Sequence, residues 1–196
     1  MKALVVSDEE SRFIWDYFDR AAFSGVELVI SCGDLHRNYL EFLCTMLPVP
    51  LYYVPGNHDK SFTENPPEGC IPLDGTVESY RGLRMCGLGG CRSSAPRRLY
   101  EYSDEQMTKM AGKLRKRVKK MGGLDILVTH APAEGLGDGN GSLHTGFSAF
   151  RDLMDEYRPK IHLFGHIHKR YHIPDPPEKY GDTRLINACG YKIIEI

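Results

Sequence analysis

Side chains that can bind metals or transfer protons follow short apolar runs at five places in this chain of 196 residues. The densest group, Gly-Asn-His-Asp at residues 56–59, comes directly after the apolar run at 50–54. Glycine permits a sharp turn and close approach to a ligand. Asn57 supplies a carbonyl oxygen, His58 an imidazole, and Asp59 a carboxylate that could orient that imidazole. The group could serve catalysis, although Asn-His-Asp also suits an ordinary turn.

The other four groups occur in the same setting. They are Asp8 after residues 3–6, Gly33-Asp34 after 26–30, His130 after 124–128, and Gly-His-Ile-His at 165–168 after 161–164. Taken singly, a Gly-Asp pair is usually a turn and a lone histidine usually a surface or core residue. Carboxyl ends of parallel strands lie at one edge of a sheet, so five such groups together are expected to converge.

The converging set would be rich in oxygen and nitrogen donors and would lack a thiolate, which favours divalent metal ions. One carboxylate, Asp34, can bridge two cations, and Gly33 before it allows the close approach. His166 and His168 are two positions apart and could serve neighbouring ions from one loop. Two cations about 3.5–4 Å apart would stabilise the oxygens of a displacement at phosphorus.

The surrounding sequence alternates strands and helices, which predicts a largely parallel sheet with crossover helices. Besides the five apolar runs, we expect a hairpin over 76–86, strands at 184–186, 192–195 and around 171, and helices over about 11–24, 38–47, 104–121 and 147–157. Ser103 and Gln106 form a capping-box pattern at the start of the third helix. Residues 60–75 and 87–100 are expected to be loops.

Composition places the chain among ordinary globular proteins, with 41% hydrophobic and 26% charged residues and a net charge of −1. Overall charge therefore gives no indication of a nucleic-acid or membrane partner. Residues 113–120 are basic at six of eight positions, which we interpret as a solvated helix face, with a nuclease as the alternative.

Location and domain organisation are predicted from the cysteines and the apolar runs. The six cysteines contain no Cys-x-x-Cys pair, which favours reduced thiols and a cytoplasmic protein. No apolar run reaches ~20 residues, so we expect no membrane span. Strand-like sequence begins at residue 2, so we expect no signal peptide. A single domain over residues 1–196 is predicted.

The order of the five groups resembles the calcineurin-like metallophosphoesterase superfamily, and residues 129–168 are most similar to its small bacterial phosphoesterases. The resemblance implies an α/β fold, a four-layer α/β/β/α sandwich of two mixed sheets flanked by helices. It also implies two divalent ions, with manganese expected and iron, zinc or nickel as alternatives. The implied ligands are Asp8, Asp34 and His168 for the first ion, and Asp34, Asn57, His130 and His166 for the second. His58 would be the general acid, oriented by Asp59.

The predicted function is metal-dependent phosphoester hydrolysis of a small-molecule substrate, by a phosphodiesterase rather than a monoesterase. His36 and His144 are candidate substrate contacts. Glu10 stands where the family has histidine; it could coordinate, turn away, or leave the first ion weakly bound. A non-catalytic protein-binding scaffold, as in the retromer subunit of similar fold, is the alternative. Glu10 fits that alternative, whereas His58 and Asp59 argue for the enzyme.

Overall fold

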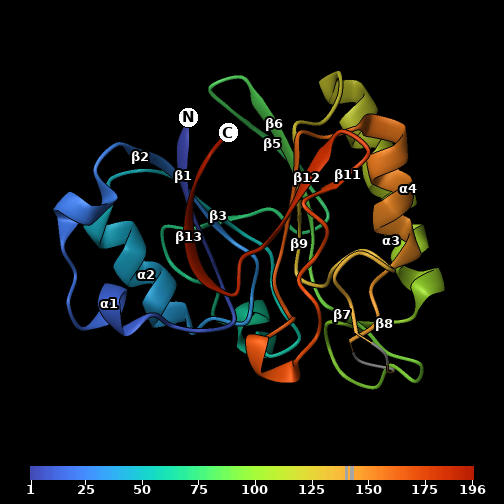
Figure 1. Cartoon of the computed structure of the whole chain (residues 1–196), viewed down its shortest axis with the longest axis horizontal. Helices are drawn as coiled ribbons and strands as arrows, with labels where there is room; N and C mark the ends of the chain where they lie inside the picture. Colours follow the sequence, from blue (N-terminus) through green and yellow to red (C-terminus); the bar gives the residue numbers. More distant parts are fainter. Residues whose placement is uncertain (140, 142–143) are drawn as a thin grey trace.

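A computed structural model describes residues 1–139, 141 and 144–196. Two sheets lie side by side in the middle of the molecule (Figure 1). The outer face of one is covered by α1 (Arg12–Trp15) and α2 (Arg37–Met46), and that of the other by α3 (Asp104–Met121) and α4 (Ser148–Tyr157). The predicted α/β/β/α sandwich of two mixed sheets flanked by helices is confirmed.

The first sheet has the strand order β13-β1-β2-β3-β4. Its parallel strands are β1 (Lys2–Ser7), β2 (Val26–Ser31), β3 (Leu51–Tyr53) and β4 (Ile71–Pro72), and β13 (Gly190–Glu195) pairs with β1 in the antiparallel direction. The parallel strands end at the same edge of the sheet, so they deliver Asp8, Asp34 and the 56–59 loop there.

The second sheet has the order β11-β12-β10-β9-β6-β5. Its strands are β5 (Val77–Tyr80), β6 (Leu83–Leu88), β9 (Ile126–Thr129), β10 (Ile161–Phe164), β11 (Lys179–Tyr180) and β12 (Thr183–Asn187). β6, β9, β10 and β12 run parallel, and the predicted hairpin is β5 with β6. A small third sheet pairs β7 (Cys91–Arg92) with β8 (Glu101–Tyr102).

The core has three layers because the parallel strands are buried on both faces. Successive side chains of a strand point to opposite faces. In β1, Ala3 and Val5 therefore pack between the sheets, whereas Leu4 and Val6 pack beneath α1 and α2. A third cluster fills the space between the second sheet and α3 and α4. This packing fixes the strands whose ends carry the polar groups.

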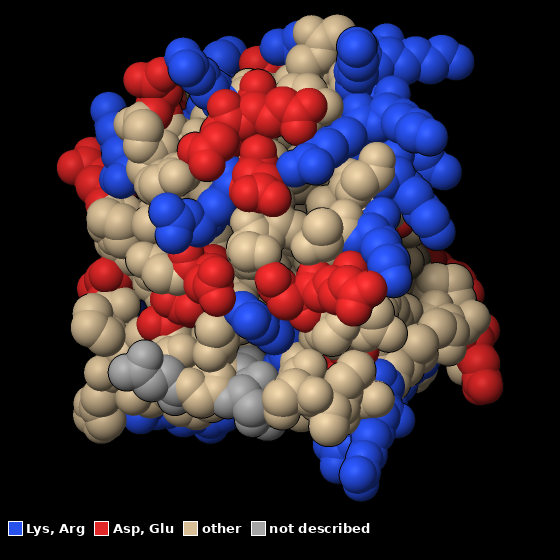
Figure 2. Space-filling view, turned by 90° about the vertical axis from the view of Figure 1, so that its right-hand side faces the viewer, with Lys and Arg blue, Asp and Glu red and all other residues tan. Residues whose placement is uncertain are grey.

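The helix α3 forms over the predicted residues. The side chain of Ser103 accepts from the backbone N–H of Gln106, whose own side chain accepts from the N–H of Ser103. Gly122 ends the helix in the left-handed conformation, with φ of 86°. On the face of the molecule shown in Figure 2, Lys and Arg gather along one side, next to Asp and Glu. Arg115 pairs with Asp152 and Glu156 of α4.

Four local predictions were wrong. The loop expected over 87–100 contains the end of β6 and the strand β7. The helix expected over 11–24 is split into α1 and a short 3-10 turn, η1 (Arg20–Phe23), which Asp19 starts by accepting from the N–H of Ala21. The strand expected around residue 171 is a 3-10 turn, η3 (Lys169–Tyr171). The expected loop 60–75 contains a third such turn, η2 (Lys60–Thr63), and the strand β4.

Within the part of the chain that the structure describes, no helix has the length and apolar character needed to cross a bilayer.

Candidate metal centre

Three of the polar residues at the strand ends adopt a backbone conformation that is rare for residues with a side chain. The φ angles are 63° at Asp8, 56° at Asp34 and 66° at His166. Such outliers cost energy and are concentrated at functional sites. The backbone N–H of Asp8 donates to the carbonyl of Gly33 at 3.0 Å, and that of His166 donates to both carboxylate oxygens of Asp8 at 3.0 and 2.8 Å. These hydrogen bonds connect the turn at Asp8 to the turns at Gly33-Asp34 and at His166.

Two glycines are required because carboxylates lie against their backbone. A Cβ at Gly56 would lie 2.0 Å from Oδ1 of Asp34, and one at Gly165 would lie 2.4 Å from Oδ2 of Asp8. Cβ atoms in proteins essentially never come this close to another heavy atom. Each glycine therefore lets the chain pass directly beside a carboxylate.

The groups predicted for the second ion come together. Asp34, His130 and His166 each present a ligand atom, all within 4.8 Å of one another. Nδ1 of His130 lies 2.7 Å from the carbonyl oxygen of Cys32, which fixes the ring. Nε2 then faces Oδ1 of Asn57 at 3.1 Å and Oδ2 of Asp34 at 3.3 Å. When Nδ1 carries the proton, the Nε2 lone pair faces two acceptor oxygens, an arrangement that a cation between the three atoms stabilises.

The electrostatics of this group favour a cation. Burial alone would lower the pKa of His130, but the carboxylates of Asp34 and Asp8 raise it to about 9. Burial opposes ionisation of Asp34, yet His130 and hydrogen bonds leave its pKa below the usual value. Burial raises the pKa of Asp8. A divalent ion would supply positive charge among these carboxylates in the same way as the imidazolium does.

Of the residues predicted for the first ion, Asp8 and His168 lie next to each other. Nε2 of His168 lies 3.6 Å from Oδ1 of Asp8, and Nδ1 of the same ring lies 3.0 Å from Oε1 of Glu9. Glu10 is directed elsewhere, because its Oε1 accepts from the backbone N–H of His36 at 3.2 Å. The carboxylate next to His168 therefore comes from Glu9 and not from Glu10.

The two residues predicted as the acid and its partner are arranged differently from the expectation. The side chain of His58 is 78% exposed, with Nε2 4.0 Å from Oδ2 of Asp34. Asp59 is buried, and its Oδ2 accepts from the backbone N–H groups of Gly56 and Asp34, each at 2.7 Å. Burial raises the pKa of Asp59 to about 6. Asp59 therefore fixes the loop beneath the ring of His58.

Both candidate substrate contacts lie beside the centre. A cavity of about 460 Å³ next to Asp34 and His58 has His36 in its wall, and the described part of that wall also includes Leu35, Phe62 and Asn65. The ring of His144 lies 5.5 Å from that of His166 and 4.5 Å from that of Tyr171.

Sequence reasoning missed three residues at the centre: Glu9, Tyr171 and Cys189. Glu9 contacts His168, Tyr171 packs against His168 at 5.1 Å between ring centres, and Sγ of Cys189 lies 3.9 Å from Nδ1 of His168. Glu9 follows directly after Asp8, and Cys189 follows the strand β12, so the position at a strand end was the available signal.

Comparison with known proteins identifies the family. Residues 1–170 match the calcineurin-like phosphoesterase family, and the chain belongs to this family.

The chain is similar to three further proteins. It is 38% identical over 69 residues to the UPF0046 protein T07D4.2 of Caenorhabditis elegans, a match over 34% of this chain and 16% of that protein. It is 32% identical over 78 residues to the UPF0046 protein C25E10.12 of the same organism, over 36% of this chain and 26% of that protein. The crystal structure of TT1561 of Thermus thermophilus is similar in fold, with a TM-score of 0.66 at 15% sequence identity. The similarity covers 96% of this chain and 89% of the TT1561 chain. The chain thus matches only a small part of both curated relatives.

Proposed function

We propose that this protein is a metal-dependent phosphoester hydrolase that prefers phosphodiesters. The observation that carries the proposal is the position of Asp34. One of its carboxylate oxygens lies 3.3 Å from Nε2 of His130, and its ligand atom is grouped with those of His130 and His166. On the other strand end, Asp8 is paired with His168, and the backbone N–H of Asp8 donates to the carbonyl of Gly33, the residue before Asp34. A carboxylate placed between two such groups can be shared by two cations.

The donor atoms fit two divalent ions. Asp8, Asp34 and His168 would hold the first, and Asp34, Asn57, His130 and His166 the second. Bound ions would supply Lewis-acid chemistry and an activated water for attack at phosphorus. The chain contributes ligand orientation: the carbonyl of Cys32 fixes the ring of His130, and the amide of His58 donates to Oδ1 of Asp34 at 2.7 Å.

His58 is proposed to donate a proton to the leaving-group oxygen. Its side chain is exposed and lines the cavity beside Asp34, where a departing alcohol would lie. Asp59 would act through the backbone as a positioning residue, because it ties the turn that carries His58 to the N–H groups of Gly56 and Asp34.

The preference for a diester is supported by the cavity next to His58. Its volume of about 460 Å³ and its apolar residues Leu35 and Phe62 suit an organic leaving group. Arg37 in the same wall is already paired with Glu41 at 2.8 Å and Glu68 at 3.6 Å. It is therefore less available to neutralise the second charge of a phosphomonoester.

The test compares a bis-aryl phosphodiester with the aryl phosphomonoester of the same phenol, using apo protein reconstituted with manganese or nickel. We expect kcat/KM to be higher for the diester and turnover to disappear with a chelator. The Asp34→Asn variant is the control for contaminating phosphatases and should be inactive. A higher kcat/KM for the monoester would contradict the diester preference. Absence of turnover with each of manganese, nickel, zinc and iron would contradict the enzyme.

A further inference from the structure

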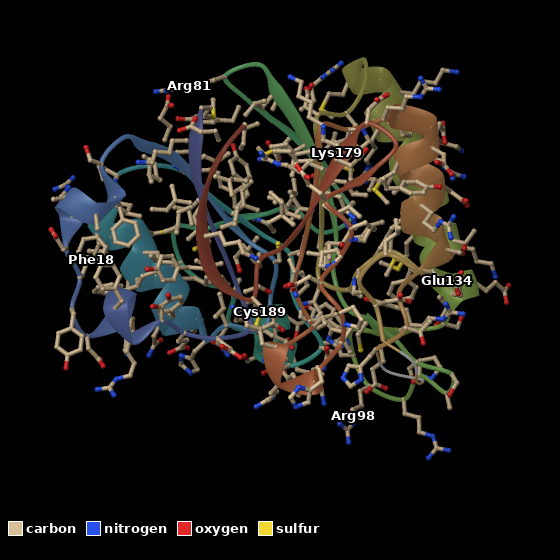
Figure 3. The ribbon with its side chains drawn as sticks, in the orientation of Figure 1. Phe18, Arg81, Arg98, Glu134, Lys179 and Cys189 are labelled. Carbon is tan, nitrogen blue, oxygen red and sulfur yellow. The ribbon has the colours of Figure 1, made fainter. Side chains whose placement is uncertain are left out.

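The side of His168 that faces away from Asp8 carries a second group of ligand atoms. Oε1 of Glu9 lies 3.0 Å from Nδ1 of His168, and Sγ of Cys189 lies 3.9 Å from the same nitrogen. The three ligand atoms lie within 4.8 Å of one another. Figure 3 shows Cys189 at the edge of the sheets, next to the 3-10 turn η3 that follows His168. The group thus borders the centre but contains a different set of donors.

The backbone holds these three residues at separate strand ends. Glu9 follows β1, His168 follows β10, and Cys189 lies between β12 and β13. The N–H of Cys189 donates to Oδ1 of Asn187 at 3.0 Å, and Nδ2 of Asn187 donates to the carbonyl of Ile167 at 2.7 Å. Asn187 therefore fixes Cys189 relative to the loop that carries His168.

Thiolate, imidazole and carboxylate are the ligands that zinc prefers, whereas manganese and magnesium prefer oxygen. Zinc–ligand lengths in tetrahedral sites place a nitrogen about 3.5 Å from a sulfur ligand and about 3.3 Å from an oxygen ligand. The observed separations of 3.9 and 3.0 Å are close to these. The side chain of Glu9 is 57% exposed, so an ion and a water as fourth ligand can enter from solvent.

We propose that Glu9, His168 and Cys189 form a zinc site that borders the two-ion centre and shares His168 with it, and that zinc bound there withdraws His168 from the centre. A neutral imidazole has one lone pair. Zinc on Nδ1 therefore leaves the ring proton on Nε2, facing Asp8, and the first ion loses this ligand. Inhibition by zinc is the consequence, and this consequence rests on the proposed hydrolase function.

The proton balance follows from the state of the thiol. A cysteine has an ordinary pKa of about 8.5, so the side chain of Cys189 starts as a thiol at neutral pH. Coordination deprotonates a thiol outright. Zinc binding releases that proton to solvent and moves the ring proton of His168 from Nδ1, where it faces Glu9, to Nε2.

Cobalt is the probe for the site itself, because a cobalt–thiolate bond gives a charge-transfer absorption in the near ultraviolet. Apo full-length protein titrated with cobalt should develop this band, and Cys189→Ser should lose it. Cys44→Ser is the matched control, since Cys44 is also half-buried, and should keep it. Absence of the band in the native protein, or its persistence in Cys189→Ser, would overturn the site. This measurement needs no substrate, so an inactive protein would not affect it.

Inhibition is tested on the manganese-reconstituted protein with the aryl phosphodiester, each variant being normalised to its own rate without zinc. Loss of one ligand should raise the zinc concentration for half-inhibition by at least ~10–100-fold, the loss caused by removing even an outer partner of a ligand. We expect this for Cys189→Ser and Glu9→Gln, and Glu9→Gln serves if Cys189→Ser does not fold. Equal sensitivity of native protein and Cys189→Ser would show that Cys189 is not a zinc ligand, and would overturn the proposal.

Discussion

Removing the carboxylate of Asp59 tests the role that the structure gives it. Both hydrogen bonds, from the N–H groups of Gly56 and Asp34, go to the same oxygen, Oδ2, at 2.7 Å. A single carbonyl oxygen can therefore replace it, so Asp59→Asn can keep both bonds. Asp59→Ala leaves both N–H groups without this acceptor, and each such loss costs ~1–3 kcal/mol. Ala should thus be less stable than Asn by about 2–6 kcal/mol.

The comparison with the native protein adds a dependence on pH. Burial raises the pKa of Asp59 from 3.8 to about 6, so the folded protein binds this proton more tightly than the unfolded chain does. The stability that it contributes is present below pH 3.8 and is lost as pH rises to about 6. The Asp59→Asn variant has no carboxyl group at this position, so its stability does not fall for this reason as pH rises. Native protein should therefore lose stability relative to Asp59→Asn between about pH 4 and 6.

Urea unfolding with a chelator present measures both effects without the contribution of bound metal. At pH 7.5 we expect Asp59→Asn to equal or exceed the native protein in stability and Asp59→Ala to fall below both. Unfolding free energies of the Ala and Asn variants within ~0.5 kcal/mol of each other, the usual effect of a neutral surface change, would contradict this role of Asp59.

Three further predictions concern the centre itself. His58→Ala should lower turnover by ~10²–10⁴ without changing metal content, and less for substrates with good leaving groups; equal losses for good and poor leaving groups in steady-state kinetics would assign His58 to positioning or metal binding. Glu10→His should bind the second equivalent of manganese more tightly in a calorimetric titration and gain activity at low metal, because Glu10 faces the N–H of His36 and leaves the first ion only Asp8, Asp34 and His168; identical titrations of both proteins would show that no ligand was missing. Manganese affinity should rise about tenfold per pH unit from pH 7 towards 9, because a metal must displace the proton that Asp34 and Asp8 stabilise on His130, whose pKa is about 9; an affinity equal at pH 7 and 8 would contradict this.

The sequence predicted the elements of the fold well where a local pattern determines them. The strands before Asp8, Asp34 and His130 are apolar runs, and α3 carries its own capping box. The helix expected over 11–24 failed because its apolar residues, such as Phe13 and Tyr17, are spaced for a helix but lie exposed at 42% and 67%. The chain there covers α2 with aromatic contacts instead, such as that between Trp15 and Phe42.

The composition of the centre was predicted from strand ends, whereas its contacts depend on tertiary structure. Nothing local shows that the carboxylate of Asp59 turns to backbone N–H groups 25 and 3 residues away. Glu9 and Cys189 meet His168 across 159 and 21 residues, because β1, β10 and β12 end at the same edge. Periodicity and spacing carry no information on such contacts.

The central claim is that Asp34 is shared by two ions at the meeting edges of the two sheets. Crystals of the protein soaked in saturating manganese, with anomalous diffraction data recorded at the manganese edge, test it directly. We expect two peaks about 3.5–4 Å apart. One should lie beside Asp8 and His168 and the other beside Asn57, His130 and His166, with a carboxylate oxygen of Asp34 in contact with both. A single peak at saturating manganese, or two peaks that do not share Asp34, would contradict it.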